Sequence, residues 1–117
     1  MPLFKRKKNN WIGLNSPEQL DSILNNKAGK SYIFKHSTRC SISTMAKARL
    51  DSIAFDDGSF YYLDLLSYRS ISNSIEEKFG IEHQSPQLIV LNEGKVIGSL
   101  THNGISGPNI QELENSI

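Results

Sequence analysis

Residues 32–43 read YIFKHSTRCSIS and include the single cysteine of the chain, Cys40. The apolar run at 32–34 predicts a buried strand, and apolar residues recur at helical spacing after it. These are Ile42, Met45, Ala46, Leu50 and Ile53. We therefore expect Cys40 where a strand turns into the first turn of an amphipathic helix. Free N–H groups and the helix dipole favour an anion there, so the position favours a thiolate.

The residues just before Cys40 are polar and partly cationic: His36, Ser37, Thr38 and Arg39. No acidic residue lies between Lys35 and Leu50 to oppose a thiolate. A lone cysteine is often a buried structural residue. The polar residues that precede Cys40 instead favour a reactive sulfur, so we interpret Cys40 as the catalytic residue.

The composition argues against several functional classes. The chain has 117 residues, which is about one domain, and 13 Lys and Arg against 12 Asp and Glu leave a net charge of +1. A protein with so little net positive charge lacks the basic surface that is typical of nucleic-acid-binding proteins. No apolar run is long enough to span a membrane. One cysteine and no signal-peptide pattern favour the cytoplasm, where thiols stay reduced. We expect a monomer that binds no metal and holds no cofactor tightly.

Helix and strand signals alternate along the chain. Residues 1–10 are expected to form a basic, flexible N-terminus and residues 11–117 one domain. Strands are predicted at 11–14, 31–34, 60–66, 87–91 and 95–100, and helices at 17–25, from 40 to about 55, at 68–79 and after 108. The run 60–66 is expected to be a central strand buried on both faces, and residues 92–94 a tight hairpin. This β-α-β-α-β-α-β-β-α order predicts an α/β protein of thioredoxin-like fold, with a mixed central sheet flanked by helices on both faces.

Ser85 and Pro86 lie just before the fourth predicted strand. Proline cannot donate a ladder hydrogen bond, so it belongs at a strand start or in a special turn. In a thioredoxin order we expect a cis proline here, which would bring the backbone of Ser85 close to Cys40 and leave it free to pair with an extended thiol ligand. His83 either faces the same cleft or is a surface histidine without a role.

Residues 35–43, KHSTRCSIS, and residues 83–87, HQSPQ, resemble the two motifs of the YtxJ family of monothiol bacilliredoxins. The resemblance extends over nearly the whole chain from Trp11 onward. It implies a thioredoxin-fold enzyme that reduces mixed disulfides between proteins and bacillithiol, with bacillithiol as co-substrate and S-bacillithiolated proteins as partners. The family usually has proline after the cysteine, whereas this chain has Ser41, so the family's reaction rate is not carried over.

A second cysteine about three residues after the first would resolve a mixed disulfide internally, and Ser43 occupies that position. Release of the intermediate is therefore expected to need an external thiol. Ser43 either donates a hydrogen bond to the thiolate or satisfies its own helix backbone.

The resemblance also implies a ligand with the two carboxylates of the bacillithiol malate group. Arg39 is the best-placed residue to bind one of them and Lys35 a weaker candidate. The other candidates for stabilising the thiolate or binding the ligand are Thr38, His36, Ser43, Ser85 and Pro86.

Two alternatives stay open at this point. One is a glutaredoxin-like protein of the same fold that serves another small thiol. The other is a non-enzymatic interaction module in which Cys40 is merely packed and the basic N-terminus docks on a partner.

Overall fold

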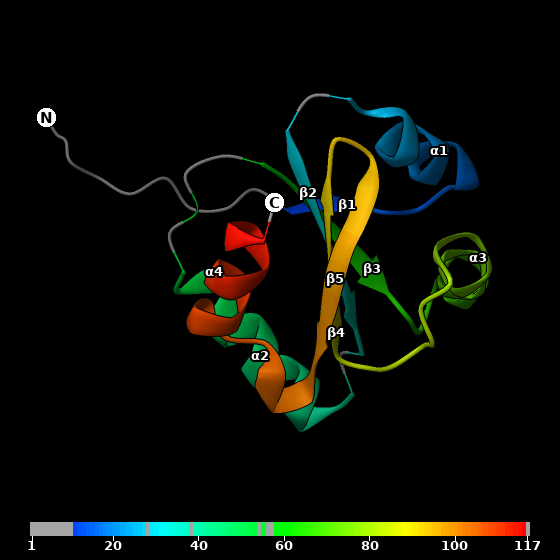
Figure 1. Ribbon diagram of the computed structural model, residues 1–117. Helices are drawn as coiled ribbons and strands as arrows, with labels where there is room; N and C mark the ends of the chain where they lie inside the picture. The colour runs from blue at the N-terminus through cyan, green and yellow to red at the C-terminus, as the bar shows by residue number, and fades with distance from the viewer. Residues whose placement is uncertain (1–10, 28, 38, 54, 56–57, 117) are drawn as a thin grey trace, which may run out of the picture.

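The computed structural model describes residues 11–27, 29–37, 39–53, 55 and 58–116, so the predicted basic N-terminus lies outside the described residues. Strands and helices follow one another in the predicted order (Figure 1). The strands are β1 (Trp11–Gly13), β2 (Lys30–His36), β3 (Ser59–Asp64), β4 (Gln87–Asn92) and β5 (Lys95–Thr101). The helices are α1 (Pro17–Asn25), α2 (Ser41–Asp51), α3 (Arg69–Phe79), the short 3-10 helix η1 (His102–Gly104) and α4 (Gly107–Asn115).

One five-stranded mixed sheet has the order β1-β3-β2-β4-β5. β3 pairs in parallel with β1 and β2, while β4 is antiparallel to both β2 and β5. The middle strand is β2, where every residue after Lys30 is buried. The expectation for residues 60–66 is wrong in part: β3 is an interior strand, but it ends at Asp64, and Tyr61 and Tyr62 are only half-buried.

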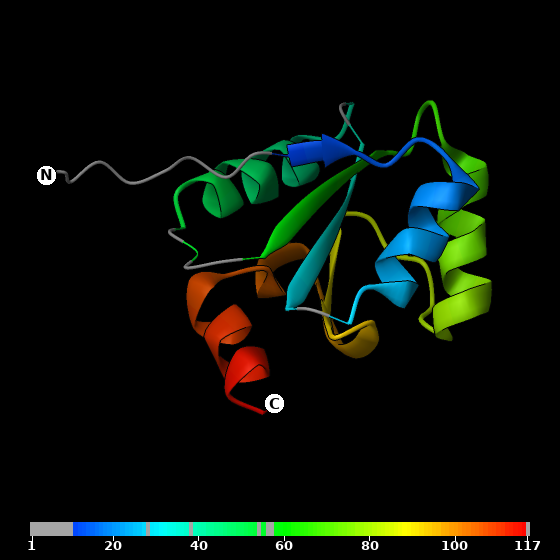
Figure 2. The same cartoon turned by 90° about the horizontal axis from the view of Figure 1, so that it is seen from above.

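Helices cover both faces of the sheet, as predicted. Figures 1 and 2 show α1 and α3 on one face and α2 and α4 on the other. Side chains alternate between the faces along each strand, so neighbouring residues of β2 enter different cores. Ile33 packs in the cluster with α1 and α3, whereas Tyr32 and Phe34 pack in the cluster with α2 and α4.

Local sequence signals explain several element boundaries. Ser16 caps α1 in a capping box with Gln19, and Gly80 ends α3 in the left-handed conformation at φ 69°. Glu93 and Gly94 both have positive φ, 53° and 81°, which is the backbone of a tight hairpin turn between β4 and β5. The tight hairpin expected at residues 92–94 is confirmed.

α2 ends at Asp51 and not near residue 55, because side chains satisfy its last turn. The Ser52 hydroxyl donates to the Arg49 carbonyl at 2.7 Å, and the Ser52 N–H donates to the carbonyls of Ala48 and Arg49. The indole N–H of Trp11 donates to the Asp51 carboxylate at 2.9 Å and ties the helix end to β1. None of the helices in the described part of the chain is long and apolar enough to cross a membrane.

Candidate active site

Cys40 lies where β2 leads into α2, as the sequence predicts. It is the N-cap residue of α2, with an extended backbone at φ −106° and ψ 119°, and its thiol is free and half-buried. Its N–H donates to the Ser37 carbonyl at 3.1 Å, and its own carbonyl accepts from the Thr44 N–H at 3.0 Å. These bonds join the loop to the helix and hold the backbone of Cys40 at the helix start.

The sulfur makes no capping hydrogen bond to the first turn of α2. An N-cap side chain nevertheless lies beside the free N–H groups of that turn, where the helix dipole favours an anion. The first turn holds no acidic residue, and Arg39 is exposed next to Cys40. The guanidinium of Arg39 is therefore accessible to a ligand.

Ser43 is fully buried and faces His36. Its side-chain oxygen lies 2.6 Å from Nδ1 of His36 and accepts a hydrogen bond from the Ser37 N–H at 3.1 Å. A hydroxyl has only one hydrogen to donate. Of the two roles left open for Ser43, the structure shows neither: the side chain cross-links the loop before Cys40 to the helix after it.

His36 is an uncharged member of this network. Burial is the largest cause that lowers its pKa below 6.5, and the nearby charge of Lys47 lowers it further, while Asp64 and the bond with Ser43 act in the opposite direction. A lowered pKa leaves the imidazole neutral near pH 7. Burial therefore disfavours a positive charge on His36, and Arg39 is the cation next to Cys40 in the sequence.

The peptide bond between Ser85 and Pro86 is cis, as expected. β4 begins at the next residue, Gln87, which pairs with Lys35 near the end of β2. Adjacent strands lie about 4.8 Å apart, so this register brings the cis peptide to the end of β2 from which the chain runs on to Cys40.

Two further observations describe the cis peptide segment. The Pro86 carbonyl accepts a hydrogen bond from the N–H of His102 at 3.1 Å, which fixes one side of the segment. The Ser85 hydroxyl oxygen is buried and has no hydrogen-bond partner in the described part of the chain.

Lys35 is fully buried, so the hypothesis that it binds a ligand carboxylate is wrong. Its position in β2 alternates with Phe34 and His36, which directs its side chain to the face covered by α3. There its ammonium nitrogen lies 3.3 Å from Nδ1 of His83, and the same nitrogen of His83 lies 2.9 Å from the hydroxyl of Ser72. His83 is thus not a surface histidine without contacts, because its ring packs against Lys35 and Ser72.

Sequence reasoning missed this polar cluster because its members are far apart in the chain. A signal was present in the sequence: Lys35 and Gln87 are polar residues at the ends of two apolar strand patterns.

Thr38, a further candidate for binding the ligand, lies outside the described residues. Among the residues that are described, no group of three or more His, Cys, Asp or Glu side chains is arranged to hold a metal ion.

Comparison with known proteins gives the family. The model of the family described as "Monothiol bacilliredoxin BrxC" matches residues 12–110. A solved structure of a candidate oxidoreductase with a thioredoxin fold is 26% identical, with a TM-score of 0.80 over 89% of this chain and 93% of that chain. The predicted resemblance and fold are therefore confirmed.

More distant structures agree with the fold. The thioredoxin of Trypanosoma brucei brucei is 16% identical with a TM-score of 0.75, over 97% of this chain and 96% of its own. The Malassezia sympodialis thioredoxin is also 16% identical, with a TM-score of 0.73 over 97% of this chain and 95% of its own. With one cysteine at the start of α2 and a family match over most of its length, this thiol–disulfide oxidoreductase belongs to the monothiol bacilliredoxin family, BrxC.

Proposed function

We propose that this protein removes bacillithiol from S-bacillithiolated proteins through Cys40, with bacillithiol as co-substrate. The observation that carries the proposal is the pairing of a half-buried free thiol at the N-cap of α2 with a serine, Ser43, three residues later. A free thiol at a helix start suits attack on a disulfide. A serine at the second position cannot complete the exchange internally.

The first step exchanges one disulfide for another. The Cys40 thiolate attacks the bacillithiol sulfur of the mixed disulfide, a bond forms between these two sulfurs, and the bond to the substrate protein's sulfur breaks. The substrate leaves as a thiolate and takes a proton from solvent. Cys40 now holds bacillithiol in a mixed disulfide.

The second step needs a thiol from outside. A free bacillithiol thiolate attacks the bacillithiol sulfur bound to Cys40, bacillithiol disulfide forms, and Cys40 leaves as a thiolate. One cysteine in the whole chain and a serine at position 43 both support this requirement.

We assign ligand binding to groups around the sulfur. Arg39 is exposed beside Cys40, and a guanidinium matches a malate carboxylate with two parallel hydrogen bonds. The backbone of Ser85, next to the cis peptide, would pair with the extended part of the ligand. Residues 11–117 act as one monomeric catalytic domain in the reducing cytoplasm, and Thr38 is a further residue on the ligand side.

Intact-mass analysis tests the proposal. After incubation with a bacillithiolated peptide, wild-type protein should release the reduced peptide and gain the mass of one bacillithiol, and the adduct should persist until a small thiol is added. Cys40→Ser should release nothing, because a serine hydroxyl is a poor nucleophile toward a disulfide sulfur. Peptide release without any adduct on Cys40 would contradict the monothiol mechanism.

Parallel reactions separate the alternatives. Faster release from a glutathionylated peptide than from the bacillithiolated one would replace bacillithiol with another small thiol as the co-substrate. Release from neither peptide, together with alkylation of Cys40 only in denaturant, would favour an interaction module.

A further inference from the structure

Lys35 is a buried lysine that the exchange chemistry does not use. Its side chain has no exposed surface although it lies in an apolar strand. Burial is the main cause that lowers its pKa to about 8, Glu76 acts in the opposite direction, and Arg69 lowers the value further. Burying an ammonium group is unfavourable unless hydrogen bonds compensate. Because the burial of Lys35 lowers the stability of the fold, its presence at this position needs a structural or functional reason.

The partners of Lys35 lie in the segment between α3 and β4, residues 81–86. The ammonium group is only a donor, so Nδ1 of His83 is the acceptor in its 3.3 Å contact with Lys35. The hydroxyl of Ser72 on α3 lies 2.9 Å from the same nitrogen and holds the ring from the same side. Burial and the charge of Lys35 lower the pKa of His83, which keeps the ring neutral and able to accept. Lys35 and buried Ser72 therefore both hold the imidazole from the interior of the protein.

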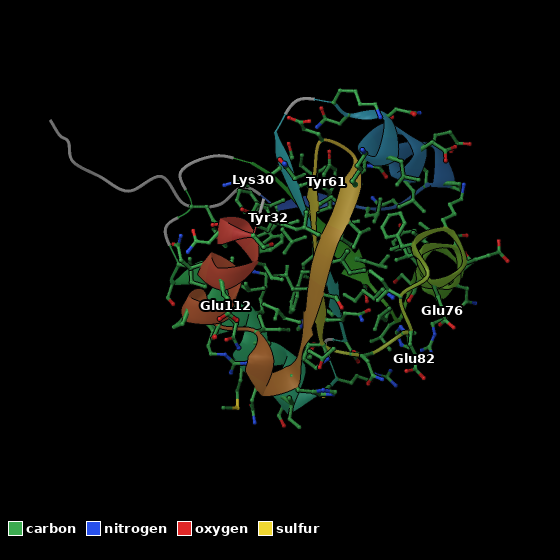
Figure 3. The ribbon with its side chains drawn as sticks, viewed as in Figure 1. Lys30, Tyr32, Tyr61, Glu76, Glu82 and Glu112 are labelled. Atoms are coloured by element: carbon green, nitrogen blue, oxygen red, sulfur yellow. The ribbon has the colours of Figure 1, made fainter. Side chains whose placement is uncertain are left out.

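Two more contacts fasten the same segment. The N–H of His83 donates to the Glu76 carboxylate of α3 at 3.2 Å, and the amide of buried Gln87 donates to the Glu82 carbonyl at 3.0 Å. Figure 3 shows Glu76 on α3 and Glu82 in the segment just beside it. Residues 81–84 have no helix or strand hydrogen bonds of their own, so these side chains fix their path.

The held segment leads directly to the cis peptide. Ser85 follows His83 by two residues and is the residue whose backbone is assigned to the ligand in the proposed function. The carbonyl of Pro86 is fixed from the other side by His102. A shift of the segment by about 1 Å is enough to weaken a bound ligand strongly.

We propose that Lys35 is a positioning residue for ligand binding: through His83 it fixes the segment that presents the Ser85 backbone to the thiol ligand bound at Cys40. This inference rests on the proposed function. Lys35 touches neither the ligand nor the sulfur and acts on the opposite face of the sheet from α2.

Steady-state kinetics with a bacillithiolated peptide test the inference. Lys35→Met keeps the length of the side chain and removes its charge and donors, so KM should rise about tenfold while kcat changes little. The alkylation rate of Cys40 by iodoacetamide needs no Ser85 pairing and should stay within about twofold of wild type. Lys30→Met, at the other end of β2 and labelled in Figure 3, is the matched control and should change neither quantity.

Variants of His83 test whether Lys35 acts on ligand binding through this histidine. His83→Leu should raise KM as Lys35→Met does, and the double variant should raise it no further, because both changes break one chain of contacts. His83→Gln offers a carbonyl acceptor to the ammonium and should restore most of the wild-type KM. An unchanged KM in His83→Leu overturns the inference even if Lys35→Met fails to fold, and so does a parallel loss of alkylation rate in either variant.

Failure of the inference differs from failure of the proposed function. If wild-type protein does not release the bacillithiolated peptide, the proposed function is wrong. Hydrogen exchange of the amides at residues 81–85 then still reports the contact: faster exchange in Lys35→Met than in Lys30→Met supports the hold on the segment, and equal exchange refutes it.

Discussion

The hydroxyl oxygen of Ser43 lies 2.6 Å from Nδ1 of His36, and this contact joins the end of β2 to the first turn of α2. The contact joins the two ends of the loop that carries Cys40, and both side chains are buried. The position that could hold a resolving cysteine is therefore occupied by a structural cross-link.

Removing the Ser43 hydroxyl should destabilise the protein. Ser43→Ala leaves Nδ1 of buried His36 without this partner and removes the acceptor of the partly buried Ser37 N–H. An unsatisfied buried polar group costs about 1–3 kcal/mol. Urea unfolding should show a fall of that size in the free energy of unfolding. Ser41→Ala, an exposed serine at the start of the same helix, should stay within about 0.5 kcal/mol of wild type. Equal effects of the two changes would mean that the network does not stabilise the fold.

Ser43→Cys should convert the protein to a dithiol. The introduced thiol can attack the mixed disulfide on Cys40 from within the chain, so the bacillithiol adduct should decay to an internal disulfide without added thiol. Intact mass against time measures the decay. Ala48→Cys, exposed and about two turns beyond Cys40 along α2, is the control and should leave a persistent adduct. Persistence of the adduct in Ser43→Cys would show that the buried side chain cannot reach Cys40.

Arg39→Ala should separate ligand binding from sulfur reactivity. Loss of the exposed guanidinium should raise KM for a bacillithiolated peptide by about tenfold, because hydrogen bonds to charged groups contribute about 1.5–3 kcal/mol. The reaction with an uncharged aromatic disulfide should change much less. Lys95→Ala removes an exposed cation from the start of β5 and should alter neither reaction. Equal losses on both substrates in Arg39→Ala would mean that Arg39 acts on the thiolate and not on the ligand.

The contribution of Lys35 to stability should rise between about pH 8 and 10.5. Burial lowers the pKa of Lys35 from 10.5 to about 8, so within this range the unfolded chain binds the proton that the folded chain has lost. The free energy of unfolding therefore increases with pH, by up to about 3 kcal/mol for a shift of this size. The charged and titratable groups that act on Lys35 are Glu76 and Arg69 of α3 and His83 of the following segment.

Comparison with Lys35→Met measures this rise. Urea unfolding at about pH 7 and about pH 10 should show the increase in wild type relative to the variant, because the other titrating groups are common to both proteins. At about pH 7 the variant should be at least as stable as wild type, since it no longer buries an ammonium group. A constant difference between the two proteins across this range would show that Lys35 does not titrate there.

The sequence by itself determined the parts of this protein that depend on neighbours in the chain. Helical spacing after residue 40, the turn at residues 92–94 and the single cysteine are local features, so they predicted the order of elements and the place of Cys40 at a helix start. Two separated motifs added the family.

Only the tertiary structure decided which side chains meet. The antiparallel register of Lys35 with Gln87 brings Lys35 to the segment of His83, 48 residues away, and places it on the face opposite α2. The pairing of His36 with Ser43 depends equally on how the loop between them closes. In a strand a shift of one residue moves a side chain to the other face, and no local pattern specifies which distant strand supplies the partner. The neutral state of His36 and the burial of Lys35 follow from these long-range contacts, because packing around a charge, and not the residue type, sets its desolvation.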